Sequence, residues 1–284
     1  MMLCVPVVRT IKERGRFAYA QRDYLPKNCI CPCKHPFIAF TDLHGRFFNM
    51  KENKYDNEIF FKKYSQMMRS QKGLQGAGEW SELQKILPDF QGKTVLDLGC
   101  GYGWHCKYAA ENGAALVLGT DISQKMIHTA KTINHAAQIE YRRAAMEDLD
   151  FSEQSFDVIL SSLAFHYIES FEPLAANIAK WIKPGGNFVF SVEHPVFTSY
   201  GSQDWYYDEN GNILHFPVDN YYYEGKREAV FLGEPVIKYH RTLTTYLNTL
   251  LQNGFELRHI IEPQPPKEMM HLDGMKGEMR RPMI

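Results

Sequence analysis

The sequence predicts an α/β protein in which helices cover both faces of a doubly wound, mostly parallel sheet. From Lys93 onward, short strand-like runs alternate with segments of helical periodicity, and glycines at 99, 101 and 103 follow the first run. Such alternation is typical of parallel strands joined by helical crossovers. The chain has 284 residues, of which 44% are hydrophobic, so it is long enough to bury a complete core.

Each expected element follows from a local pattern. Short runs bounded by turn or helix signals predict strands at residues 94–98, 115–120, 139–143, 156–161, 187–192 and 255–261. Apolar residues at helical spacing predict helices at 58–68, 104–112, 123–133, 174–182 and 243–251. Ser123 is suited to cap one helix, while Gly113 and Gly254 are suited to end two others. Lys183-Pro184-Gly185-Gly186 predicts a turn before the fifth strand.

The chain divides at about residue 50. Residues 1–49 are locally basic and lack a sustained helical or strand period, so we interpret them as an N-terminal extension outside the core, with Met50 as a candidate true start. A targeting peptide is the alternative, although Glu13 and Asp23 are unusual in one. Residues 50–284 form the predicted domain, with a cofactor-binding core at 93–192 and an aromatic insert at 195–240.

Composition narrows the class of protein. A formal net charge of -1 and a pI of about 6.8 give no excess of positive charge, which argues against a nucleic-acid partner. No apolar run approaches the roughly 20 residues needed to span a bilayer. We expect a cytoplasmic protein, monomeric or homodimeric, without a membrane partner. Cys29, Cys31, Cys33 and His35 lack the second ligand pair of a zinc site, so we predict free thiols and no metal.

Glycines and a carboxylate predict the cofactor site. Gly99, Gly101 and Gly103 follow the first strand, at the sheet edge where open α/β folds bind ligands. Glycine adopts the backbone angles of a tight turn and lets a ligand approach the backbone. The Gly-x-Gly-x-Gly spacing differs from the dinucleotide pattern Gly-x-Gly-x-x-Gly. Asp121 ends the second strand about 20 residues later, where a carboxylate can accept hydrogen bonds from both ribose hydroxyls.

Several segments together resemble class I S-adenosylmethionine (SAM)-dependent methyltransferases, specifically the methyltransferase type 11 family. Val95-Leu96-Asp97-Leu98-Gly99-Cys100-Gly101-Tyr102-Gly103 resembles motif I, and Gly119-Thr120-Asp121-Ile122-Ser123 resembles the second motif. Later segments fit as well: Glu147-Asp148-Leu149, Phe156-Asp157-Val158-Ile159 with Ser161-Ser162-Leu163, and Lys183-Pro184-Gly185-Gly186. The resemblance covers about residues 55–284 and implies a Rossmann-like class I methyltransferase fold with SAM as cofactor.

Carried over position by position, the resemblance implies a set of cofactor-binding residues. They are Asp97 near the SAM ammonium, Gly99 and Gly101 against its aminopropyl part, Asp121 at the ribose, Ile122, Met146 and Glu147 around the adenine, Ser161 to Leu163 beside the sulfonium, and Tyr64 near the carboxylate. Ala145 stands where related chains often have Asp, so no polar contact is expected there.

The resemblance also departs at the end of the chain. The family's seventh strand inserts antiparallel between the fifth and sixth strands. It should follow Arg280-Arg281-Pro282-Met283-Ile284, where the sequence stops. We therefore expect a C-terminally truncated fold that lacks the last strand, exposes the edge of the sixth strand and is less stable than a complete relative.

Two histidines are candidate catalytic residues. Methyl transfer from a sulfonium is an in-line displacement, and a general base is needed only when the nucleophile is protonated. His194 follows the fifth strand and His166 the fourth, so both are expected at the ligand-binding edge. The alternative for each is a structural or substrate-contact role. Glu193 could orient His194 or remain solvated.

The insert is expected to face the methyl acceptor. Its aromatic stretch 197–223 is either a lid or a small satellite core, and Lys238-Tyr239-His240-Arg241 adds positive charge nearby. We predict an enzyme that methylates a small-molecule acceptor. The alternatives are an RNA or protein methyltransferase, which the balanced charge disfavours, a non-catalytic SAM-binding regulator, and an NAD dehydrogenase, which the glycine spacing disfavours.

Overall fold

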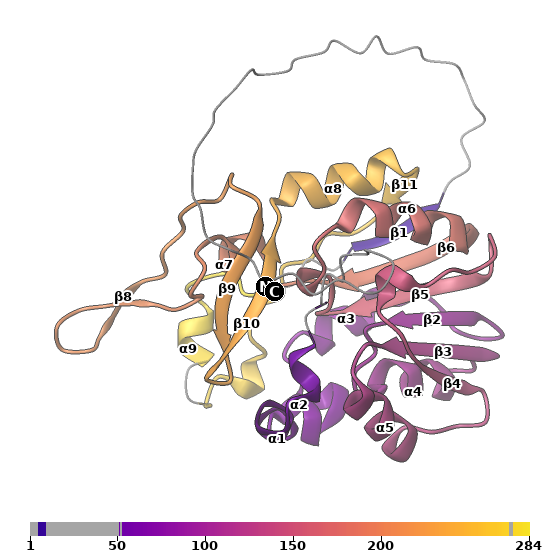
Figure 1. Cartoon of the computed structure of the whole chain (residues 1–284), viewed down its shortest axis with the longest axis horizontal. Helices are drawn as coiled ribbons and strands as arrows, with labels where there is room; N and C mark the ends of the chain where they lie inside the picture. Colours follow the sequence, from indigo (N-terminus) through magenta and orange to yellow (C-terminus); the bar gives the residue numbers. More distant parts are fainter. Residues whose placement is uncertain (1–4, 10–50, 52, 273–274) are drawn as a thin grey trace, which may run out of the picture. The chain divides into compact units, whose positions relative to one another are not determined.

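A seven-stranded sheet organises the chain, of which the computed structural model describes residues 5–9, 51, 53–272 and 275–284 (Figure 1). The strand order is β11-β1-β6-β5-β2-β3-β4. Five neighbouring strands are parallel: β2 (Thr94–Leu98), β3 (Leu116–Asp121), β4 (Ile139–Arg143), β5 (Phe156–Ser162) and β6 (Ile182–Ser191). The predicted parallel sheet is therefore confirmed, and the carboxyl ends of these strands meet at one edge.

An N-terminal strand occupies the position that the resemblance assigns to a C-terminal one. β1 (Val5–Arg9) lies between β6 and β11 (Phe255–Leu257) and pairs antiparallel with both. Val7, for example, is opposite Phe188 of β6 and Leu257 of β11. Two expectations were wrong: residues 5–9 are part of the sheet, not of an extension outside it, and β11 has a strand partner. Local patterns could not predict this pairing because its partners are at the other end of the chain.

The remaining residues of the expected extension lie outside those that the structure describes. Of the predicted extension at 1–49, only residues 5–9 are among the described residues. Cys29, Cys31, Cys33 and His35 lie outside the described residues. In the described part, Cys100 and Cys106 are free thiols, and no group of His, Cys, Asp and Glu could hold a metal ion. No described helix is long and apolar enough to cross a bilayer.

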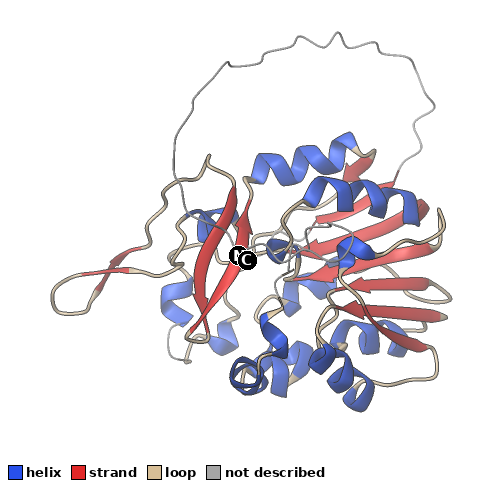
Figure 2. Cartoon of the chain, in the orientation of Figure 1, coloured by secondary structure: helices blue, strands red, loops and turns tan. Residues whose placement is uncertain are grey.

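Helices cover both faces of the sheet (Figure 2). Because successive strand residues point to opposite faces, Leu96 and Leu98 of β2 join one buried cluster and Val95 joins the other. The first cluster includes residues of α6 (Phe171–Trp181) and α8 (Leu243–Gln252). The second includes residues of α3 (Trp80–Ile86), α4 (Trp104–Glu111) and α5 (Gln124–Ile133). The core is thus two apolar layers that fix the strand ends in place.

Some element boundaries differ from the predictions. The residues predicted to turn before the fifth strand, 183–186, are included in β6, and the register between β5 and β6 shifts between Phe156 and Val158. Gly185 has a φ of +74°, so the irregularity is a bulge in the strand instead of a separate turn. β11 ends at Leu257, earlier than expected, and α6 begins at Phe171, earlier than expected.

Two hairpins follow the parallel core. β9 (Gly225–Phe231) and β10 (Glu234–His240) pair antiparallel, and Ala229 and Val236 pack against Phe60 of α1 (Glu58–Ser65). β7 (Tyr206–Tyr207) and β8 (Ile213–His215) are joined by a turn, which the bond from Asp208 N to Asn212 O at 2.9 Å closes. The remaining elements are η1 (Lys54–Asp56), α2 (Met68–Gln71), η2 (Gly73–Gly76), η3 (Met146–Asp148), η4 (Phe165–Tyr167), α7 (Pro195–Ser199), η5 (Lys267–Met269) and α9 (Met275–Glu278).

Candidate functional site

The glycine loop after β2 adopts backbone angles that favour glycine. Gly99, Gly101 and Gly103 have φ values of +73°, +54° and +78°. A Cβ at Gly99 would lie 2.6 Å from the Cβ of Ala164, and one at Gly103 would lie 2.2 Å from the hydroxyl oxygen of Tyr141. A Cβ at Gly101 would meet no atom within 4 Å. Packing therefore requires the outer two glycines, whereas the middle one borders open space that a ligand could fill.

Asp121 is held in place by backbone amides on both sides. The N–H of Gly101 donates to its Oδ2 at 2.9 Å, and the N–H of Ser123 donates to its Oδ1 at 2.8 Å. Burial raises the pKa of Asp121 to about 6 despite these two bonds. Ser123 caps α5 by accepting from Met126 N, as predicted. Each carboxylate oxygen of Asp121 retains a lone pair for a further donor, such as a ligand hydroxyl.

Asp97 is a buried carboxylate beside the same loop. Its side chain accepts a hydrogen bond from the Sγ of Cys106 at 3.3 Å. Burial raises its pKa to about 7, with a smaller contribution from Asp121. None of the lysines and arginines in the described part forms an ion pair with it. A buried carboxylate without a cationic neighbour suits a positively charged ligand group, because such a group would compensate its desolvation.

The other predicted cofactor residues lie on neighbouring strand ends. Met146 of η3 borders the loop, since its Cε would be 3.3 Å from a Cβ at Gly99. Ser161 donates through Oγ to the carbonyl of Leu98 at 2.8 Å, which ties β5 to β2. Leu163 has a φ of +54°, an unusual value for a residue with a side chain. Ile122 is half-buried next to Asp121, whereas Glu147 on η3 is exposed.

A roof segment, η1 and α1, connects to the sheet edge; Tyr64 of α1 was predicted as part of the site, whereas η1 was not. Asp56 accepts from the Oγ of Ser123 at 2.6 Å and from Lys125 N at 3.0 Å. Although partial burial opposes ionisation, these bonds lower the pKa of Asp56 to about 2. On the other side, the hydroxyls of Tyr55 and Tyr167 are 3.2 Å apart. Asp56 lies two residues before the predicted helix at 58–68, but no motif distinguishes it.

Tyr64 faces an aromatic group within this roof. Its ring makes edge contacts with Tyr55, at 5.2 Å between centroids, and with Tyr102 of the glycine loop, at 5.7 Å. Burial raises the pKa of Tyr64, with Asp121 contributing, so the hydroxyl stays protonated. Tyr64 of α1 therefore lies beside the glycine loop.

His194 has protein partners at both ring nitrogens. Its Nδ1 accepts from Val196 N at 3.1 Å and caps α7, while Nε2 is 3.1 Å from Oε1 of Glu262. With Nδ1 accepting, the neutral ring carries its proton on Nε2, facing Glu262. Burial lowers the pKa of His194. Glu193 does not orient His194 through any of these contacts.

Glu193 belongs instead to a buried cluster that we call the Glu193 clasp: Glu193, Gln203 and Lys238. Lys238 Nζ donates to Glu193 Oε1 at 2.5 Å and to Gln203 Oε1 at 2.7 Å, and Gln203 Nε2 donates to Glu193 Oε2 at 2.7 Å. Burial opposes ionisation of Glu193, but Lys238 keeps its pKa below the usual range. His166 lies 3.9 Å from Glu193 Oε1, and burial lowers the pKa of His166 to about 4.

The insert divides into two parts with different surroundings. Two positive charges of 238–241 bind protein groups: Lys238 is in the clasp, and Arg241 is buried and donates to the carbonyls of Phe165 and Glu169. Within 197–223, Phe197 stacks on Phe216 at 5.7 Å in a satellite cluster. The hairpin β9–β10, in contrast, packs on α1 and contacts η4 after β5.

Known proteins resemble this chain over most of its length. A family model described as a methyltransferase domain matches residues 96–190. An S-adenosylmethionine-dependent methyltransferase from Mesorhizobium loti has a structure with a TM-score of 0.69 and 40% identity, covering 74% of this chain and 96% of that one. A Listeria monocytogenes structure assigned to the same class has a TM-score of 0.71 and 55% identity, covering 74% of this chain and 95% of its own.

One of the similar proteins has a name that states its function. A ubiquinone biosynthesis O-methyltransferase of Neisseria meningitidis is 32% identical over 166 residues, which are 53% of this chain and 69% of that protein. Together with the glycine loop, the buried carboxylates and the sheet, these similarities decide the family. The chain belongs to the class I S-adenosylmethionine-dependent methyltransferases of the type 11 group, and S-adenosylmethionine is its cofactor.

Proposed function

We propose that this methyltransferase acts on a small-molecule acceptor. The acceptor would bind beneath the roof segment, η1 and α1, and the β9–β10 hairpin that packs on it. The observation that carries the proposal is that this roof joins the sheet edge on two sides, through Asp56 at α5 and through Tyr55 at Tyr167. Phe60, Ala229 and Val236 pack the helix and hairpin of the roof together. Enclosure favours a ligand small enough to be covered. The cytoplasmic location and the monomeric or homodimeric state stay predictions.

The residues at the strand ends fit the cofactor. We propose that Asp121 accepts from the ribose hydroxyls, that Asp97 lies near the ammonium, and that the backbone of Gly99 and Gly101 packs on the aminopropyl part. The remaining proposed contacts are Ile122, Met146 and Glu147 at the adenine, Ser161 and Leu163 near the sulfonium, and Tyr64 at the carboxylate. The open space at Gly101 and the unpaired carboxylate of Asp97 support this assignment. When bound, SAM supplies an electrophilic methyl group.

The acceptor atom is proposed to be nucleophilic as it arrives, for example an amine, a carboxylate or a thiolate. A general base needs a lone pair directed at the acceptor. His194 uses both nitrogens for protein contacts, and His166 Nδ1 accepts from Glu193 N at 3.4 Å. We therefore propose that both predicted catalytic histidines position the strand ends and do not take a proton. The expected signature is a turnover rate that His194→Gln reduces without changing the pH profile.

The test is to follow a radiolabelled methyl group from SAM into fractionated cell extract. Label in the fraction of small molecules supports the proposal. Label in the RNA or protein fraction would replace it with a macromolecular acceptor, and SAM binding without label in any fraction would favour the regulator. Asp121→Asn is the matched control, because it is expected to retain the fold and to lose labelling in every fraction.

A further inference from the structure

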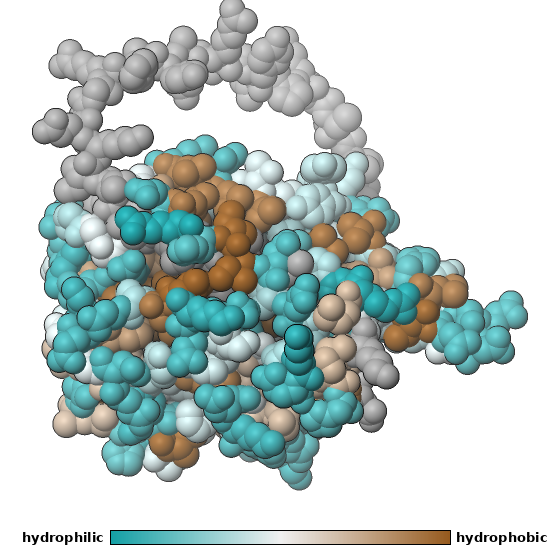
Figure 3. All heavy atoms as spheres, turned by 180° about the vertical axis from the view of Figure 1, so that it is seen from behind, coloured by the Kyte–Doolittle hydropathy of each residue, from teal (hydrophilic) through white to brown (hydrophobic). Residues whose placement is uncertain are grey.

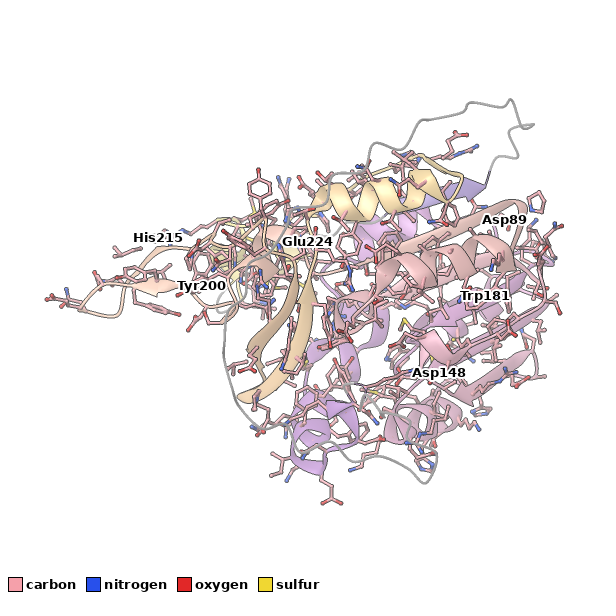
Figure 4. The ribbon with its side chains drawn as sticks, turned by 45° about the horizontal axis from the view of Figure 1, so that its top comes forward. Asp89, Asp148, Trp181, Tyr200, His215 and Glu224 are labelled. Atoms are coloured by element: carbon pink, nitrogen blue, oxygen red, sulfur yellow. The ribbon has the colours of Figure 1, made fainter. Side chains whose placement is uncertain are left out.

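A cavity of about 240 Å³ is built from segments that the proposed donor site does not use. It lies among α7, the β7–β8 hairpin and residues 280–282, and its main lining residues are Val196, Trp205, His215, Phe216, Arg280 and Arg281. In Figure 4, His215 lies on the projecting β7–β8 hairpin, at the opposite side of the view from Asp148 of η3. None of the predicted cofactor residues lines this cavity.

The floor of the cavity is a guanidinium group stacked among aromatic rings. The Cζ of Arg281 is 4.6 Å from the ring centre of Phe197 and 4.9 Å from those of Trp205 and Phe216. Glu278 accepts from both terminal nitrogens of Arg281, at 2.6 and 3.1 Å. The pair is nearly buried, with 7% and 19% of the two side chains exposed. Arg281 is therefore neutralised and rigid, and it holds the aromatic walls in position.

Arg280 supplies a positive charge that no carboxylate of the described residues neutralises. Its terminal nitrogens donate to the backbone carbonyls of Ile213, at 3.3 Å, and Leu214, at 2.6 Å. Its guanidinium also lies 5.3 Å from the ring centre of Trp205. Within the described residues no carboxylate lies within ion-pair distance of Arg280. Neutral carbonyls fix its orientation but leave its charge and further N–H donors available to a ligand.

The surrounding hairpin surface is apolar where it meets this cavity. Ile213 and Leu214 are exposed large hydrophobic residues of β8, and Val218 follows them. From behind, hydrophobic side chains gather along the projecting part, whereas its tip is hydrophilic (Figure 3). A ligand with a charged end and an apolar body would therefore find both kinds of surface at one place.

We propose that this cavity binds a small aromatic carboxylate. Trp205, Phe216 and His215 offer planar walls for a ring, and Arg280 offers charge-assisted hydrogen bonds to the carboxylate. Arg280, Arg281 and Glu278 leave one net positive charge, which matches a monoanion better than a phosphate dianion. The volume lies below the roughly 300–1,000 Å³ of drug-sized sites, so the ligand has one or two rings. The wall of the cavity at Val196 belongs to α7, which follows the carboxyl end of β6.

The experiment titrates the full chain with benzoate by calorimetry and by the fluorescence of its tryptophans. Benzamide, a neutral analogue of the same shape, and inorganic phosphate, an anion without a ring, are the comparison probes. We expect benzoate to bind at least about tenfold more tightly than either, because only benzoate uses both the rings and the charge. Equal binding of benzamide, or no saturable benzoate binding, would overturn the proposal.

Two variants and one competition assign the site. Arg280→Gln is expected to weaken benzoate binding about tenfold while leaving SAM binding unchanged. Arg258→Gln, at an exposed arginine paired with Glu256, is the matched control and should change neither affinity. Unchanged benzoate binding in Arg280→Gln would overturn the assignment. Displacement of SAM by benzoate would also overturn it, since the ligand would then occupy the donor site.

Discussion

At the scale of single residues, the proposed donor site depends mainly on two carboxylates, the buried Asp97 and the half-buried Asp121. Both lie near the carboxyl ends of adjacent strands, β2 and β3, where backbone positions are fixed by the parallel ladder. Burial raises the pKa of each, to about 7 and about 6. Their ionised forms are therefore costly in the ligand-free protein, and a ligand that stabilises the charged form gains affinity from the same groups.

Asp121→Asn is expected to weaken SAM binding by about ten- to hundredfold, the effect of losing charge-assisted hydrogen bonds. The amide has only one accepting end, so it cannot accept from both Gly101 N and Ser123 N. Calorimetric titration of SAM measures the change. Asp157→Asn is the matched control: Asp157 accepts from Thr94 N and Lys183 Nζ near the opposite strand ends. It should lower stability and leave SAM affinity unchanged; equal affinities in both variants would contradict the ribose role.

The affinity for SAM is expected to rise with pH between about 5.5 and about 7.5. Protons compete with SAM while Asp121, with a pKa of about 6, and Asp97, with a pKa of about 7, are protonated, so binding releases protons. Titrations in buffers of different ionisation enthalpy measure this release. Asp97→Asn should remove the part of the slope near pH 7. A dissociation constant independent of pH would rule out carboxylate contacts with the cofactor.

The same two groups give ligand-free stability the opposite sign. A carboxyl pKa raised by folding means that the folded state holds protons that the unfolded state has released. Between about pH 4 and about pH 7, these two residues therefore lower the free energy of unfolding as pH rises. Asp56, whose pKa is about 2, has the opposite effect. It stabilises the fold at pH values above the pKa of the unfolded carboxyl group, and this stabilisation is lost as the pH falls toward 2.

At the scale of elements, the Glu193 clasp connects three segments: the end of β6, the loop at Gln203 and the more distant β10. The Lys238 side chain is 3% exposed and that of Glu193 is 14% exposed. Gln203 has a φ of +56°, an uncommon backbone value that the two side-chain bonds hold in place. The clasp therefore fixes the β9–β10 hairpin against the end of β6.

Lys238→Met is expected to lower the free energy of unfolding by about 3 kcal/mol, because it leaves the Glu193 carboxylate buried without its cation. Urea denaturation measures the loss. Adding Glu193→Gln to this variant should recover much of it, since no buried charge then remains. Lys226→Met is the control on β9, where the lysine is 58% exposed, and should change stability by about 0.5 kcal/mol or less. Equal losses of stability in Lys226→Met and Lys238→Met would show that the buried Glu193–Lys238 ion pair contributes no more than an exposed pair.

At the scale of the whole molecule, the sheet is completed by residues from opposite ends of the chain. β1 separates β6 from β11, so without it both would have unpaired edges, and open edges promote association. The donor site lies on β2 and β3, which do not border β1. Stability and cofactor binding are therefore expected to respond differently to changes in β1.

Val7→Pro is expected to lower the free energy of unfolding by at least about 1 kcal/mol, the contribution of one backbone hydrogen bond. Proline has no N–H to donate, and Val7 stands between two paired strands. Val7→Thr, which keeps the N–H and a β-branched side chain, should lose less. Thermal unfolding compares the two, and SAM affinity should be the same in both. Unchanged stability in Val7→Pro would mean that β1 contributes nothing to the sheet.

Prediction from the sequence succeeded where the signal is local. Alternating runs predicted the five parallel strands, and the spacing of Gly99, Gly101 and Asp121 predicted residues that meet at one strand edge. Ser123 caps its helix as expected. These features depend on backbone angles and side-chain periodicity within a few residues, which the sequence encodes directly. The catalytic roles of His166 and His194 stay predictions, because a residue type at a strand end does not specify which partner its nitrogens will have.

By itself, then, the sequence determined the parallel core and the glycine loop, because each follows from neighbouring residues that obey one period or one turn, and the resemblance of these segments to the methyltransferase family indicated the methyl donor. Tertiary structure alone decided that β1 completes the sheet, that Lys238 neutralises Glu193 and that Tyr55 meets Tyr167. These contacts join segments that are far apart in sequence: 45 residues for Glu193 and Lys238, 112 for Tyr55 and Tyr167, and nearly the whole chain for β1 and β11. Their energies depend on burial and on the partner that folding brings close, so no local pattern records them in advance.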